Sequence, residues 1–203
     1  VSQTMSLAQR LYEQGLITYM RTDSVNLSGQ ALAQTKEEVI KLFGEKYHQI
    51  RNYKTKTKGA QEAHEAIRPS YLDRTTIEGN AAEKRLYELI WKRTVASQMV
   101  AAEIDRTVVT IEMNGGEAQF IATGEVVRFD GFLRLYSEST DEEPAESNEA
   151  ILPKIEVGEK VIASQILGTE RFTVAPPRYN EASLVKRLEE LGIGRPSTYA
   201  PTI

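Results

Sequence analysis

The sequence predicts an α+β protein, with helices before and after a small antiparallel β region. Apolar residues at helical spacing, separated by capping residues and glycines, fill the first part of the chain. β-branched residues and an Asn-Gly-Gly turn follow after Ala101, and helical spacing returns after Pro177. We therefore divide the chain into a helical domain at residues 1–100, a β segment at residues 101–176 and the start of a second helical segment at residues 177–203.

Two helices are predicted first along the chain. Residues 5–12 keep apolar side chains on one face, and Gly15 is placed to end this helix. The next helix begins at Ser28, because serine caps helix N-termini well, and it runs to Phe43 before Gly44. These two helices form the first half of the helical domain.

A short third helix and a longer fourth helix complete the helical domain. The third covers residues 60–68 and stops before Pro69, since proline forces the preceding residue out of helical geometry. The fourth begins at a capping box formed by Asn80 and Glu83. Its buried face is expected to comprise Leu86, Leu89, Ile90, Ala96 and Met99.

The β segment is expected to consist of short antiparallel strands, with a tight turn at the Asn-Gly-Gly sequence. The stretches with strand composition are residues 106–113, 118–127, 133–136, 160–167 and 171–175. After them, Asn180 caps a helix whose apolar face includes Leu184 and Leu188, and Gly192 ends it. A further helix is expected to start at Pro196.

Composition bounds the class of protein. With 203 residues, 40% of them hydrophobic, the chain is long enough to bury a core. It has no cysteine, which excludes disulfides and thiolate metal sites and fits a cytoplasmic protein. No apolar run approaches the roughly 20 residues of a membrane span, and the acidic stretch at residues 137–150 is interpreted as a surface loop rather than a metal site. Both ends of the sequence look cut, and we expect a fragment of a longer protein.

The stretch "GLITYMRTDS" at residues 15–24 carries the most informative chemistry. In an extended segment, Tyr19, Arg21 and Asp23 share one parity and therefore point the same way. A tyrosine hydroxyl is a weak nucleophile at neutral pH unless a cation or a base assists it, and an arginine is suited to binding a phosphate. Together these residues suggest attack on a phosphodiester. The alternative is a packing tyrosine beside a local ion pair of Arg21 and Asp23.

Three stretches, "GLITYMRTDS", "AHEAIRPS" and "LVKRLEELGIGRPSTYA", resemble signature segments of type IA DNA topoisomerases, and their order and phrasing are most similar to the bacterial topoisomerase I branch. The resemblance implies an enzyme that relaxes negatively supercoiled DNA without ATP. Such an enzyme cuts one strand by tyrosine attack, forms a 5′-phosphotyrosine link, passes a strand through the gap and reseals it. The sibling enzymes topoisomerase III and reverse gyrase remain alternatives, as does a non-catalytic module that binds single-stranded nucleic acid.

The resemblance also assigns roles to individual residues by position. Tyr19 matches the nucleophile of the family, and Arg21 matches the arginine beside the scissile phosphate. His64 matches a histidine that organises the cleaved phosphate region, although a structural histidine bonded to a neighbour is the alternative. Arg195 and Thr198 match residues that contact the single-strand backbone.

The resemblance further implies what this chain lacks. Family members hold Mg²⁺ in an acidic cluster of an N-terminal toprim domain, and no Asp-x-Asp-x-Glu pattern occurs in the 203 residues. The cofactor is therefore expected to bind a domain of the same polypeptide that is absent from this chain, with no metal ligand here, and the isolated chain is expected to be inactive. By the same resemblance, the helical domain swings away to open the DNA gate, the β segment belongs to the arch, and the last helices begin the base that grips single-stranded DNA.

Overall fold

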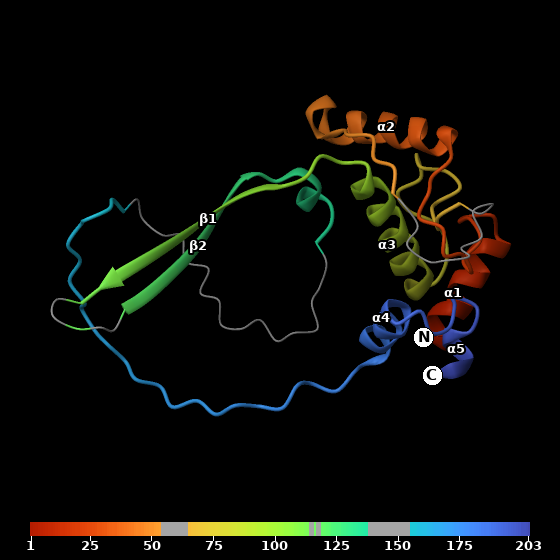
Figure 1. Ribbon diagram of the computed structural model, residues 1–203. Coiled ribbons are helices and arrows are strands. Elements are labelled where there is room, and N and C mark those ends of the chain that lie inside the picture. Colours follow the sequence, from red (N-terminus) through yellow and green to blue (C-terminus); the bar gives the residue numbers. More distant parts are fainter. Residues whose placement is uncertain (54–64, 114–115, 117–118, 138–154) are drawn as a thin grey trace. The chain divides into compact units, whose positions relative to one another are not determined.

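The computed structural model describes residues 1–53, 65–113, 116, 119–137 and 155–203 (Figure 1). The chain divides into two compact units. The first, called here the helical unit, comprises Val1–Ala102, Asp130–Ser139 and Tyr179–Ile203, and the second, the β unit, comprises Glu103–Phe129 and Thr140–Arg178. Helices and a two-stranded antiparallel sheet occur together, so the α+β prediction is confirmed.

The first two helices have the bounds that their capping residues predict. Helix α1 (Ser2–Glu13) is followed by Gly15, whose φ of +70° lies in the left-handed region that ends helices. Helix α2 (Gly29–Phe43) begins after Ser28, whose hydroxyl accepts a hydrogen bond from a backbone amide of the first turn, and it ends at Gly44. A short 3₁₀ turn, η1 (Glu45–Tyr47), follows.

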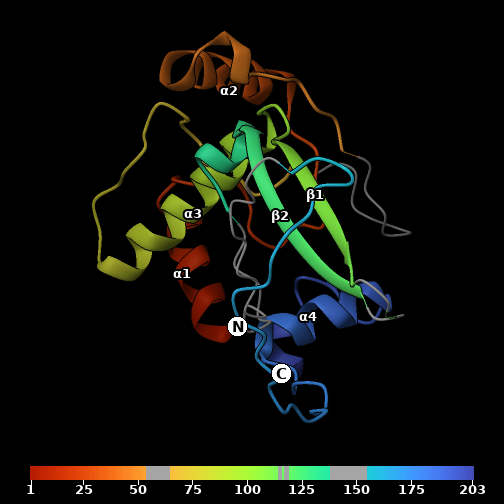
Figure 2. The same cartoon turned by 90° about the vertical axis from the view of Figure 1, so that its left-hand side faces the viewer.

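Helix α3 (Ala81–Ser97) forms the centre of the helical unit and packs against α1 (Figure 2). The predicted capping box is confirmed: Asn80 Oδ1 accepts from the backbone amide of Glu83 at 2.9 Å, and the Glu83 carboxylate accepts from the backbone amide of Asn80 at 3.0 Å. Glu83 also pairs with Arg10 of α1 at 3.5 Å. The helix start is therefore joined to its neighbour as well as capped.

The buried face of α3 differs from the prediction. Leu89 is 50% exposed, and Leu86 and Ile90 are only partly buried, whereas Ala96 and Met99 are buried as expected. The face turned to the core instead includes Tyr87, Trp91, Thr94 and Val95. Its position is set by a segment that runs beside the helix, because the Tyr87 hydroxyl donates to the Arg74 carbonyl and the Trp91 indole donates to the Leu72 carbonyl, both at 2.8 Å.

The third predicted helix, residues 60–68, is not confirmed. Residues 60–64 lie outside the described part of the chain, and residues 65–68 are not helical. The described end of this stretch instead approaches the segment after α1, where Ile17 and Pro69 form an antiparallel bridge. Backbone pairing with another segment replaces the intrahelical hydrogen bonds that the composition alone favoured.

The β unit contains the strands β1 (Glu103–Glu112) and β2 (Gln119–Phe129), paired antiparallel with Thr107 opposite Gly124. The other strand predictions are wrong for the described residues. Residues 133–136 overlap the 3₁₀ turn η2 (Gly131–Arg134), and residues 160–167 and 171–175 form no strand. A strand needs hydrogen bonds from a partner strand, and the described residues supply none there, so their composition alone does not produce a sheet.

Within the helical unit, a set of contacts called here the clasp involves the residues that come directly before β1 and directly after β2 in the sequence. The Tyr47 hydroxyl donates to Asp130 Oδ1 at 2.8 Å and accepts from the Arg134 guanidinium at 3.0 Å. The backbone amide of Phe132 donates to the Val100 carbonyl at 2.9 Å. Gly131 lies so close to this carbonyl that an added Cβ would be 2.5 Å from its oxygen. The clasp therefore depends on a residue without a side chain.

The last helices follow the predicted order. Helix α4 (Glu181–Glu190) begins with a capping box of Asn180 and Ser183, and Gly192 follows its end with a φ of +68°. Helix α5 (Tyr199–Thr202) begins a few residues after Pro196, later than predicted. In the described part of the chain, every helix is too short or too polar to cross a membrane.

Candidate functional site

The segment after α1 presents its side chains alternately to the core and to the surface. Met20, Thr22 and Ser24 are buried, whereas Tyr19 is 38% exposed and Arg21 is exposed. The segment bends at Thr18, Met20 and Arg21, so the alternation describes exposure and not a regular strand. Tyr19 is not a core residue, as predicted, whereas a face shared by the Tyr19 hydroxyl and the Arg21 guanidinium stays a prediction.

The ring of Tyr19 is supported by α1. Its centroid lies 5.3 Å from that of Tyr12, with the two ring planes at 70°, the edge-to-face arrangement that aromatic pairs favour. Tyr12 itself is on the last turns of α1, directly before the glycine that redirects the chain. The helix end and the tyrosine are thus fixed to each other by side-chain packing as well as by sequence proximity.

Arg21 and Arg195, which come from two separate motifs, line the same small cleft of about 90 Å³ within the helical unit. Asp23, Pro196 and Ser197 complete its lining. Two guanidinium groups with one carboxylate leave the cleft with a net positive charge, and planar guanidinium groups match the oxygens of a phosphate. The structure therefore joins two sequence-predicted site residues in a cleft that suits a phosphodiester.

The turn that carries Arg195 is shaped by Thr198. The Thr198 hydroxyl accepts from the backbone amide of Arg195 at 2.8 Å and donates to the Arg195 carbonyl at 3.1 Å. Gly194, with a φ of +80°, packs so closely on the Tyr199 ring that a Cβ would be 2.9 Å from a ring carbon. Thr198 therefore lies in the same turn as Arg195, and its hydroxyl serves that turn in this structure.

The carboxylates of Glu189 and Asp23 lie close enough to Tyr199 to affect the pKa of its phenol. Burial raises the pKa of the Tyr199 phenol, and the negative charges of Glu189 and Asp23 raise it further. The phenol therefore stays neutral at physiological pH.

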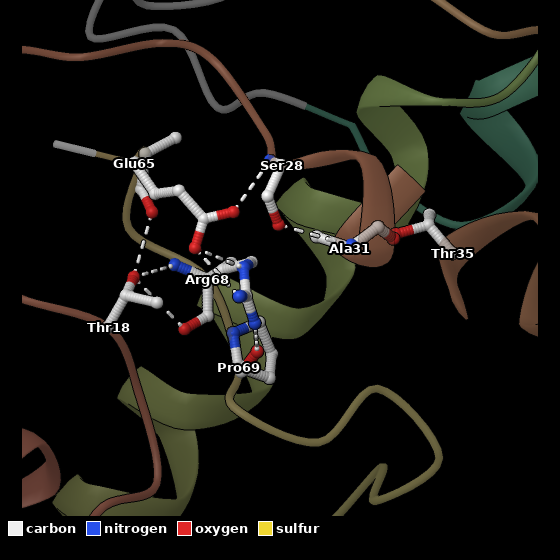
Figure 3. A network of polar contacts seen from close by, with 8 residues as sticks. Thr18, Ser28, Ala31, Thr35, Glu65, Arg68 and Pro69 are labelled. Atoms are coloured by element: carbon white, nitrogen blue, oxygen red, sulfur yellow. Dashed lines mark hydrogen bonds and ion pairs between the residues drawn. The ribbon is translucent and has the colours of Figure 1, made fainter. Parts of the chain in front are cut away.

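A second set of contacts surrounds the residue before the candidate nucleophile (Figure 3). The Thr18 hydroxyl donates to the Ala66 carbonyl at 2.8 Å and accepts from the Arg68 backbone amide at 2.9 Å. The Arg68 guanidinium pairs with Glu65 at 2.7 Å. Sequence reasoning assigned no role to Thr18, because its partners Ala66 and Arg68 lie far away along the chain, and it considered Glu65 only as a possible partner of His64. The predicted site residue His64 lies outside the described residues.

The described residues do not fit a Mg²⁺ site. No group of three or more histidine, aspartate or glutamate side chains in this part of the chain is placed to hold a metal ion. The carboxylate nearest to the candidate chemistry, Asp23, shares its cleft with Arg21 and Arg195. Guanidinium groups beside a single carboxylate favour an anion over a hard cation.

These features define a protein with an exposed tyrosine two residues before an arginine that lines a small cationic cleft. A family model described as DNA topoisomerase matches residues 1–203, so the chain belongs to the DNA topoisomerase family. The resemblance to type IA enzymes of the bacterial topoisomerase I branch is thereby confirmed.

Individual relatives agree with this family. DNA topoisomerase 1 of Zymomonas mobilis is 46% identical over 208 residues, which cover 100% of this chain and 17% of that protein. DNA topoisomerase 1 of Rickettsia felis is 47% identical over 213 residues, which cover 97% of this chain and 27% of that protein. Full-length topoisomerase I from Thermotoga maritima matches the fold with a TM-score of 0.70 and 38% identity over 98% of this chain and 32% of its own. The chain thus spans less than a third of each relative.

Proposed function

We propose that this chain is the tyrosine-bearing part of a type IA DNA topoisomerase that relaxes negatively supercoiled DNA by transient single-strand cleavage. The observation that carries the proposal is the exposure of Tyr19 and Arg21, two residues apart on the segment after α1, with Arg195 lining the cleft beside Arg21. A hydroxyl and two cations near one phosphate-sized space are what nucleophilic attack on a phosphodiester requires.

In the proposed reaction, the Tyr19 oxygen attacks a backbone phosphorus of one DNA strand. A bond forms between the tyrosine oxygen and phosphorus, and the bond from phosphorus to the 3′ oxygen breaks. The phenolic proton leaves the tyrosine, and the departing 3′ oxygen gains a proton to become a hydroxyl. The new ester keeps the energy of the broken one, so attack by the 3′ hydroxyl reseals the strand without ATP.

Each predicted site residue has a distinct role in this proposal. Arg21 binds the non-bridging oxygens of the scissile phosphate, where negative charge develops. Arg195 binds a neighbouring phosphate of the single strand, and Thr198 shapes the turn that presents it and contacts the same backbone. His64 organises the cleaved phosphate region, a role that rests on its position in the motif.

The proposal extends to the parts of the chain and to the whole polypeptide. Residues 1–100 act as the domain that moves to open the gate, residues 101–176 belong to the arch, and residues 177–203 begin the base that binds single-stranded DNA. Mg²⁺ is held by a toprim domain of the same polypeptide, outside this chain, and the enzyme works in the cytoplasm. On this division of labour the isolated chain forms no covalent adduct.

The experiment is to incubate the full-length enzyme and its Tyr19→Phe variant with a single-stranded oligonucleotide and Mg²⁺, and to look for an adduct that survives denaturation. We expect the variant to form no adduct while binding the oligonucleotide as the wild type does, because only the hydroxyl is lost. An adduct in the Tyr19→Phe variant would refute the assignment. Absence of any adduct in the wild type, with binding that depends on the Tyr19 ring, would favour a non-catalytic single-strand-binding module.

A further inference from the structure

The strand before Tyr19 is paired with a segment that lies far along the chain. The backbone amide of Thr18 donates to the Arg68 carbonyl, and the amide of Ser70 donates to the Leu16 carbonyl, both at 2.9 Å. Between these two bonds, Ile17 faces Pro69, and both side chains are buried. In this kind of antiparallel pair, the two facing residues make no backbone hydrogen bond to each other, because their neighbours make the bonds on both sides. Pro69 has no amide hydrogen and therefore loses no hydrogen bond at this position.

The Thr18 side chain adds two further bonds to this pairing. Its hydroxyl donates to the Ala66 carbonyl at 2.8 Å and accepts from the Arg68 amide at 2.9 Å. One hydroxyl thus satisfies two backbone groups of the facing segment. Tyr19, the proposed nucleophile, therefore directly follows a residue that is held through both its backbone amide and its hydroxyl.

The facing segment is itself fixed to helix α2. The Glu65 carboxylate accepts from the backbone amide of Ser28, the N-cap of α2, at 2.6 Å. Its other oxygen accepts from two nitrogens of the Arg68 guanidinium, at 2.7 and 3.2 Å, and the remaining Arg68 nitrogen donates to the Pro69 carbonyl at 2.9 Å (Figure 3). The guanidinium is 14% exposed and uses every nitrogen within the protein, so it is engaged in structure and not available to a phosphate.

We propose that Thr18, Glu65 and Arg68 are positioning residues that hold the backbone of Tyr19 where its hydroxyl can attack the DNA phosphate. The inference rests on the proposed function. The ring of Tyr19 is 38% exposed and packs against Tyr12, and the clamp of these three residues adds a constraint on the backbone directly before Tyr19. In catalysis that depends on approach geometry, a displacement of about 1 Å in a reacting group costs roughly 100-fold in rate.

The test uses the full-length enzyme and measures two quantities: the single-turnover rate of oligonucleotide cleavage and the affinity for the same oligonucleotide. Thr18→Val removes the hydroxyl at nearly constant volume, and Thr18→Ser keeps the hydroxyl. Thr94→Val is the matched control, because the Thr94 hydroxyl also donates to a backbone carbonyl at 2.8 Å but lies in α3, outside the clamp. Arg68→Lys, which keeps the charge beside Glu65 but cannot make all the Arg68 bonds, provides a second variant should Thr18→Val fold poorly.

We expect Thr18→Val to cleave roughly 10- to 100-fold more slowly with unchanged affinity, Thr18→Ser to recover most of the rate, and Arg68→Lys to fall between them. Thr94→Val should cleave normally. Cleavage by both Thr18→Val and Arg68→Lys at the wild-type rate would overturn the positioning role. So would a loss of rate that is fully explained by a loss of folded protein, or an equal loss of rate in Thr94→Val. Failure of the wild type to form an adduct at Tyr19 would instead refute the proposed function, on which the inference rests.

Discussion

Replacement of Gly131 by alanine should loosen the clasp within the helical unit. The residue has a φ of +48°, and an added Cβ would lie 2.5 Å from the carbonyl oxygens of Val100 and Ala101. Both oxygens belong to the backbone, so no side-chain rotation can relieve the contact. The left-handed conformation costs an alanine about 1–2 kcal/mol, and the backbone shift that the contact demands costs about 1–3 kcal/mol more. We therefore expect a loss of about 2–5 kcal/mol in the free energy of unfolding.

The matched control is Gly15→Ala, since Gly15 also has a positive φ, +70°, but no atom lies within 4 Å of its added Cβ. This variant should lose only about 1–2 kcal/mol. Denaturant unfolding of both variants can be followed by the fluorescence of Trp91, the single tryptophan, which is 5% exposed in the helical unit. Equal losses in the two variants would refute the argument, because the difference between them measures the contact at the clasp alone.

The other predictions concern the core, the clamp and the cleft. Trp91→Ala should lower the free energy of unfolding by about 3–5 kcal/mol, and Leu89→Ala should lower it by less than about 1 kcal/mol, as measured by circular dichroism. A larger loss for Leu89→Ala would mean that α3 buries the face predicted from the sequence and not the face of Trp91. Burial raises the pKa of Glu65, but hydrogen bonds from Arg68 and the α2 N-cap outweigh it and hold the pKa below the ordinary value of 4.5. The ionised Glu65 therefore stabilises the fold above pH 4.5, and this stabilisation is lost as the pH falls through the lowered pKa of the folded state. Glu65→Gln should make the free energy of unfolding depend less on pH in this acidic range. An unchanged pH dependence would contradict the assignment. Arg195→Ala should weaken single-strand binding by the full-length enzyme and reduce its salt slope by about 1, whereas an unchanged slope would remove Arg195 from the phosphate contacts.

The features that sequence reasoning predicted correctly depend on neighbours along the chain. Ser28 and Asn80 cap helices by binding amides within the next turn, and Gly15 ends one by its own backbone freedom. The exposure of Tyr19 and Arg21 on either side of the buried Met20 also follows a local alternation along the chain. Such features need no knowledge of the tertiary fold.

The features that sequence reasoning missed depend on distant partners. The inward face of α3 is selected by carbonyls of Leu72 and Arg74, which accept from its aromatic side chains, and helical spacing cannot identify these acceptors. The shared cleft of Arg21 and Arg195 likewise joins opposite ends of the chain. Family resemblance assigned both arginines to DNA, but only the folded chain brings them together.

Pro69 has a consequence for how the segment of Tyr19 can be misplaced. Slipping an antiparallel pair by one residue requires one of its strands to turn over. If the strand of Pro69 turned, the proline would face its partner with no donor to offer. If the other strand turned, the buried side chain of Ile17 would be brought out to water. Pro69, which cannot donate a hydrogen bond, therefore excludes one wrong alignment directly, and the burial of Ile17 disfavours the other.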